Sequence, residues 1–128
     1  MGFLSRYSSQ ILGLTRITAG LCFLEHGTTK LFGFPGAAPA SLSLFPALLA
    51  GLIEVIGGLL LLVGFQTRVA ALIMSGEMAV AYFYAHQPRA WFPFNNGGEL
   101  AIMFCFVFLY LAVAGGGPWS VDARLRRG

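Results

Sequence analysis

A histidine and a lysine four residues apart, His26 and Lys30, stand where the first apolar segment gives way to a polar one, and Glu25 directly precedes them. Residues four apart share a helix face, so the two side chains lie together if the segment is helical. A histidine beside a carboxylate and an ammonium group can hydrogen-bond an oxygen atom or transfer a proton near neutral pH. These residues therefore indicate a binding or proton-transfer site.

Further polar and aromatic residues occur at the ends of the later apolar segments, which we expect to face the same side of a membrane. Aromatic rings beside histidine and carboxylate suit a quinone headgroup, whereas an ordinary polar rim that anchors the helices is the alternative. The scattered spacing is not diagnostic of a metal site, and we predict none. The candidate ligand-binding residues of this outer cluster are Glu25, His26, Lys30, Tyr84, His86, Trp91 and Glu99.

A second group of charges lies near the middle of three apolar segments: Arg16, Glu54 and Glu77. A charge near the centre of a bilayer costs at least ~2.5 kcal/mol, so we expect the guanidinium to donate to one or both carboxylates. One interpretation is a buried salt bridge that fixes the helix register. The other is a site that carries a proton or anchors a ligand, because one base facing two acids leaves a carboxyl group that holds a proton.

The composition places these residues in a membrane protein. Of the 128 residues, 57% are hydrophobic and 10% are charged, whereas soluble domains carry about 25% charged residues. Four apolar segments, at about 8–26, 46–64, 67–86 and 98–115, predict one all-α domain over residues 1–128, an integral four-helix bundle. The sparse basic residues form no patch or RNA-binding motif, which argues against a nucleic-acid partner.

The distribution of basic residues predicts the topology. We expect the longest loop at 27–45, and the short FQTR connection predicts a hairpin between the second and third segments. Arg6, Arg68, Arg124, Arg126 and Arg127 fall on one side of the membrane, and Lys30 and Arg89 fall on the other. The positive-inside rule then places both termini in the cytoplasm.

The two cysteines give no sign of a redox centre. Cys22 and Cys105 lie inside apolar segments, outside any CxxC or CxxCH motif. The usual role of such a cysteine is that of a small buried apolar residue. We therefore expect no covalently bound cofactor.

Several motifs, taken together, resemble those of the DoxX family of small four-span bacterial membrane proteins. They are R-x3-G-x5-HG-x2-K (Arg16, Gly20, His26, Gly27 and Lys30), KLFGF, E-x2-GG-x5-GFQTR (Glu54, Gly57, Gly58, Gly64 and Arg68), NGGELA around Glu99, and GPWSVDA around Asp122. The resemblance covers nearly the whole chain.

The resemblance implies a multi-pass protein of the bacterial cytoplasmic membrane. Relatives that gave the family its name are linked to terminal-oxidase and thiosulfate:quinone oxidoreductase systems. The expected function is therefore a membrane subunit or accessory of a quinone- or thiol-linked oxidoreductase system, with a quinone as ligand and with protein partners or further copies of the chain in a membrane complex. The alternatives are a structural subunit of a larger complex and a small proton or solute transporter.

Overall fold

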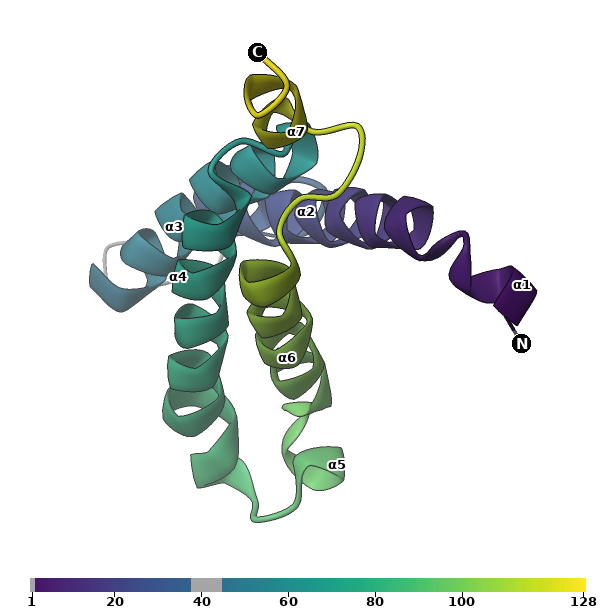
Figure 1. The fold of residues 1–128 in the computed structure, drawn as a ribbon. Helices are drawn as coiled ribbons and strands as arrows, with labels where there is room; N and C mark the ends of the chain where they lie inside the picture. The colour runs from purple at the N-terminus through teal and green to yellow at the C-terminus, as the bar shows by residue number, and fades with distance from the viewer. Residues whose placement is uncertain (1, 38–44) are drawn as a thin grey trace.

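The computed structural model describes residues 2–37 and 45–128, and every regular element in these ranges is helical (Figure 1). The prediction of an all-α protein is thereby confirmed. The long helices are α2 (Ser8–Phe32), α3 (Phe45–Val63), α4 (Thr67–Ala81) and α6 (Glu99–Ala114). The short elements are α1 (Gly2–Ser5), the π-helical turn η1 (Tyr82–His86), the 3₁₀ turn η2 (Gln87–Arg89), α5 (Pro93–Asn96) and α7 (Val121–Leu125).

The long helices form two antiparallel pairs. Helix α2 packs along α3, and α4 packs along α6, whereas α2 and α6 touch each other at few places. In Figure 1, α4 and α6 run side by side down the view while α2 runs across it. The aromatic rings of Phe23, Phe104 and Phe108 join the two pairs, with ring centroids 4.9 Å apart for Phe23 and Phe104 and 4.5 Å apart for Phe23 and Phe108.

Glycines allow α2 and α3 to approach closely. A Cβ atom on Gly20 would lie 3.0 Å from the carbonyl oxygen of Gly58, and one on Gly27 would lie 2.7 Å from the backbone nitrogen of Val55. Backbone atoms cannot move aside as side chains can, so a larger residue would push the helices apart. This is the small-residue packing that is typical of helices in membranes.

Helix α2 is longer than the sequence predicted. It continues past His26 to Phe32, so residues 27–32 are helical and do not belong to the expected loop; residues 38–44 of that loop lie outside the described residues. Gly27 does not end the helix because it serves the contact with α3. The helix ends at Gly33, whose φ is 69° and whose N–H donates to the Thr29 carbonyl oxygen at 3.0 Å.

Among the described residues, two helical stretches are long and apolar enough to cross a membrane. They are Phe45–Val63, which is α3, and Thr67–Arg89, which comprises α4, η1 and η2. Helix α6 is apolar but has only 16 residues. The outward face of α3 consists of large exposed apolar side chains, a surface suited to lipid contact; it includes Leu48, Leu49, Leu52, Ile56, Leu59 and Val63.

Candidate functional site

Arg16 is fully buried, but its partners are backbone carbonyl groups and not carboxylates. Its Nη1 donates to the Gly116 oxygen and its Nη2 to the Trp119 oxygen, each at 3.0 Å. The prediction that Arg16 pairs with Glu54 and Glu77 is therefore wrong. Glu54 lies beside Gly27, eleven residues along α2 from Arg16, which is about 16 Å at the helical rise.

The segment that binds Arg16 joins α6 to α7, and it is held against the turn between α3 and α4. A Cβ atom on Gly64 would collide with Arg16 Nη1 and with Ser120, and Gly64 has a φ of 71°. The N–H of Asp122 donates to the Gly64 oxygen at 2.9 Å. We refer to Arg16, Gly64, Gly116, Trp119 and Asp122 as the Arg16 cluster.

Asp122 caps helix α4 from a distant part of the chain. Its two carboxylate oxygens accept the N–H groups of Gln66 and Thr67, each at 2.9 Å, at the start of α4. Burial alone would raise the pKa of Asp122, but the hydrogen bonds from Thr67 and Gln66 and the nearby Arg126 stabilise the charged form. The pKa of Asp122 is therefore lowered from its usual value.

This cap gives stability that depends on pH. Because the pKa of Asp122 is lower in the folded state than in the unfolded state, its contribution is complete above the usual value of 3.8 and is lost as the pH falls further, through the folded pKa. We expect Asp122→Asn to lower the free energy of unfolding by about 1 kcal/mol at neutral pH. When that free energy is measured by detergent unfolding at a series of pH values, it should fall less steeply in acid for this variant than for the wild type. Glu25→Gln, which retains Asp122, should lose stability with acid as the wild type does. An equally steep fall in acid for Asp122→Asn would contradict the assignment.

The partner of Glu54 is Lys30, whose Nζ lies 2.5 Å from Glu54 Oε1. Glu54 is 1% exposed and Lys30 is 30% exposed, so the pair links the interior to the end of α2. The Glu77 carboxyl group lies close to the Glu54 carboxyl group, and among the described residues no N–H or hydroxyl group donates to its buried oxygens or to Glu54 Oε2. We call Lys30, Glu54 and Glu77 the buried triad. It contains one cation and two acids, so one shared proton makes it electrically neutral.

A cavity of about 330 Å³ opens beside the buried triad and is mostly apolar. Its polar groups come from α2, α3 and η1, and its apolar walls come mainly from α4 and α6, with one further residue each from α2, η1 and the turn before α6. The lining residues are Phe23, His26, Lys30, Glu54, Met78, Ala81, Ala85, His86, Gly97, Leu100, Ala101 and Phe104.

The hydrogen-bond pattern fixes the tautomer of neutral His86. Its Nδ1 lies 3.2 Å from the Asn96 carbonyl oxygen, which can only accept, so Nδ1 carries the proton. Nε2 is then a hydrogen-bond acceptor. Asn96 is held in turn by the Ala90 oxygen at 3.1 Å and the Tyr82 hydroxyl at 3.3 Å. His86 also closes the π-helical turn η1, a distortion that is frequent at functional sites.

The structure divides the predicted outer cluster. His26, Lys30 and His86 line the cavity, together with Glu54 from the other predicted group. The remaining members, Glu25, Tyr84, Trp91 and Glu99, are exposed and do not line it. His26 is also exposed, but its ring lies against those of Phe23 and Phe104, with centroids 5.9 and 6.3 Å away.

The sequence interpretation missed the apolar walls of the cavity. Phe23, Met78 and Phe104 line the cavity beside the polar groups, and none of the three is among the candidate site residues that the sequence indicates. The feature of the sequence that could have indicated the cavity is a set of small residues near the end of α4 and the start of α6. Small side chains there leave room for a ligand; the residues are Ala81, Ala85, Gly97 and Ala101.

The site thus combines a mostly apolar cavity with four polar side chains in its wall, those of His26, Lys30, Glu54 and His86. Lys30 can donate hydrogen bonds, His86 Nε2 can accept one, and the carboxyl groups of the buried triad have unpaired oxygens. This donor and acceptor set fits a planar molecule with polar oxygens on an otherwise apolar ring. The same groups can move protons to or from such a molecule.

Comparisons with known proteins agree with the resemblance seen in the sequence. A family model described as DoxX matches residues 11–87, more than half of the chain and the part that runs from α2 to the start of η2. The match includes the buried triad, His26 and His86.

Two relatives are similar over most of their length. A protein of Haemophilus influenzae named only "Uncharacterized protein" is 40% identical over 130 residues, 97% of each chain. "Putative oxidoreductase CatD" of Bacillus subtilis is 25% identical over 119 residues, 90% of this chain and 87% of that protein. No solved structure matches the chain.

Proposed function

Because the chain belongs to the DoxX family of small bacterial membrane proteins, we propose that it is a membrane subunit of a quinone-linked oxidoreductase system. The cavity beside the buried triad is the quinone-binding site in this proposal. The name of the Bacillus subtilis relative supports a redox association. The single observation that carries the proposal is the meeting of Lys30, Glu54 and His86 at one apolar cavity.

We further propose a multi-pass four-helix arrangement in the cytoplasmic membrane with both termini in the cytoplasm. The N-terminal part of α2, the α3–α4 turn and the C-terminal tail meet in the Arg16 cluster, so most arginines lie at one end of the molecule. Among them, Arg68 binds the carbonyl oxygens of Ala112 and Val113 at the end of α6. The positive-inside rule assigns this end to the cytoplasm.

A quinone bound in the cavity would take up two electrons and two protons on reduction. Lys30 would hydrogen-bond one ring oxygen, and His86 would bind the other through Nε2, accepting from a hydroxyl or, when protonated, donating to a carbonyl. Glu54, which lines the cavity and belongs to the buried triad, would be the acid closest to the bound ring and would supply one of the two protons. Because the chain has no redox motif, electrons come from a partner protein in this proposal.

The proposal predicts that His86 contributes to quinone affinity. We expect His86→Leu to raise the Kd of a soluble ubiquinone or menaquinone analogue about tenfold, because one hydrogen bond is lost. Titration of detergent-purified protein by isothermal calorimetry measures this change. Tyr84→Phe is the matched control, since Tyr84 lies two residues before His86 but does not line the cavity, and the Kd of this variant should stay at the wild-type value. If the wild-type protein binds neither analogue, the proposal is contradicted.

A further inference from the structure

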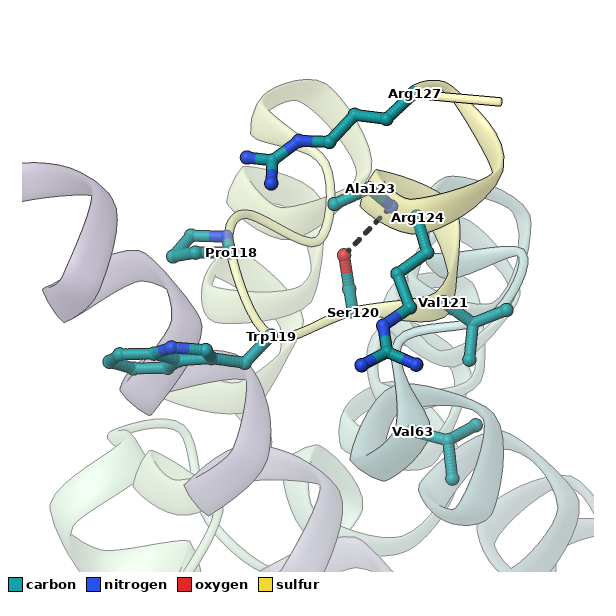
Figure 2. Close-up of a pocket in the computed structure, with 8 residues that line it drawn as sticks. All are labelled: Val63, Pro118, Trp119, Ser120, Val121, Ala123, Arg124 and Arg127. Carbon is teal, nitrogen blue, oxygen red and sulfur yellow. Dashed lines mark hydrogen bonds between the residues drawn. The ribbon is translucent and has the colours of Figure 1, made fainter.

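A second cavity, of about 610 Å³, lies at the opposite end of the molecule from the quinone-binding site, next to the Arg16 cluster. It is enclosed by the end of α3, the segment before α7, and α7 itself (Figure 2). The lining residues are Val63, Pro118, Trp119, Ser120, Val121, Ala123, Arg124 and Arg127. Nothing in the proposed redox function uses this cavity.

Its charged groups are two arginines of the tail. Figure 2 shows Arg124 beside Ser120 and Val121, extending toward Val63, while Arg127 extends over Ala123 toward Pro118. Among the described residues, neither guanidinium takes part in a hydrogen bond or an ion pair. The acid on the same helix, Asp122, is occupied by the backbone of Gln66 and Thr67. The cavity therefore presents two positive charges without an internal partner.

The floor of the cavity is apolar and continues along a membrane helix. Val63 is exposed at the end of α3, and exposed apolar residues follow it on the same face at helical spacing: Leu59, Ile56 and Leu52. The exposed ring of Trp119 lies at the other side of the cavity, packed against Gly13 of α2. Tryptophan is enriched where membrane meets water.

We propose that this cavity is a binding site for an anionic phospholipid. The phosphate group would lie between Arg124 and Arg127, and one acyl chain would follow the apolar face of α3 from Val63 toward Leu52. A small soluble anion would gain from the arginines but not from the apolar floor, so a headgroup with attached chains fits both parts. Basic pockets at the ends of membrane helices bind lipid headgroups through this combination.

The test uses Trp119 as its own reporter. The chain has two tryptophans, so the Trp91→Phe variant leaves Trp119 as the sole indole, and Trp91 lines neither this cavity nor the quinone-binding site. The variant is reconstituted into phosphatidylcholine vesicles containing a titrated fraction of phosphatidylglycerol brominated near the headgroup end of its acyl chains. Quenching of Trp119 by bromine then reports which lipid occupies the cavity, and brominated phosphatidylcholine gives the baseline.

We expect brominated phosphatidylglycerol to quench the fluorescence of Trp119 at a several-fold lower mole fraction than brominated phosphatidylcholine does. Arg124→Gln with Arg127→Gln should remove this preference, at about fivefold in apparent affinity for each arginine. Arg6→Gln with Arg89→Gln changes the net charge equally but touches neither wall of the cavity, and it should keep the preference. Equal quenching by both lipids would overturn the proposal. A preference for phosphatidylglycerol that remains after Arg124 and Arg127 are replaced would also overturn it. If millimolar inorganic phosphate abolishes the preference, the ligand is a free anion and the proposal is likewise overturned.

Discussion

Replacing Lys30 with methionine is expected to lower the free energy of unfolding by about 2–3 kcal/mol. The change leaves Glu54, 1% exposed, beside Glu77 with no cation. Removing one partner of a buried ion pair leaves an uncompensated charge, which typically costs 3–5 kcal/mol. The partial exposure of Lys30 reduces that figure, because water reaches the place where the ammonium was. Unfolding in mixed dodecylmaltoside and dodecylsulfate micelles, followed by circular dichroism, measures the effect.

The double variant Lys30→Met with Glu54→Gln separates this cause from lost packing. Because glutamine removes the stranded charge at nearly constant shape, the double variant should be more stable than Lys30→Met alone. Glu54→Gln alone should cost less than Lys30→Met, since the free ammonium can extend toward water. A double variant no more stable than Lys30→Met would show that the ion pair is not the source of the loss.

Arg16→Leu is expected to destabilise the protein by about 3–5 kcal/mol and to release the C-terminal tail. Arg16 donates to two carbonyl oxygens, and each hydrogen bond from a charged group is worth about 1.5–3 kcal/mol. Without it the Gly116 and Trp119 oxygens lose their donors, and Asp122 loses a nearby cation. Because Arg124, Arg126 and Arg127 follow in the tail, trypsin should cut Arg16→Leu there several times faster than the wild type.

The matched control is Arg6→Leu. Arg6 is exposed and lies over the rings of Phe3 and Tyr7, so its loss should change stability by no more than about 0.5 kcal/mol and leave the tail protected. The loss of stability in Arg16→Lys should lie between those of Arg16→Leu and Arg6→Leu, because one ammonium group cannot reproduce the two donor nitrogens of a guanidinium. Equal trypsin rates in Arg16→Leu and the wild type would show that Arg16 does not hold the tail.

The helices themselves could be predicted, because composition and turn residues act locally. Pro46 lies in the first turn of α3, and the Gly64 and Gln66 positions with positive φ make the short turn before α4. The prediction of a hairpin there agrees with the packing of α3 against α4. The end of α2 could not be predicted in the same way, because a glycine at position 27 is typical of a loop in sequence. Its role in the close contact with α3 is visible only in the folded structure.

The partners of the charges were mispredicted for a geometric reason. When depth is counted from the middle of each apolar segment, a first span that ends at His26 places Arg16 at its centre and Lys30 outside the span. Side chains on a helix lean toward its N-terminus, so the Lys30 ammonium lies about a turn earlier than its Cα, at the level of Gly27 and Glu54. The contacts of the glycines show this register: Gly27 of α2 lies against Val55 and Glu54, and Gly51 of α3 lies against Leu31 and Lys30.

The contacts of Arg16 also constrain how the chain is made. Arg16 and Gly116 are 100 residues apart, and translation at ~5–20 residues per second needs ~5–20 s to synthesise what lies between. Throughout that interval α2 carries an arginine whose two carbonyl acceptors do not yet exist. In the multi-pass arrangement proposed above, Arg16 lies at the cytoplasmic end of the molecule, so its guanidinium can stay in contact with water until the tail is made. The final docking of α2 follows the emergence of the last helix, so assembly is completed only as translation ends.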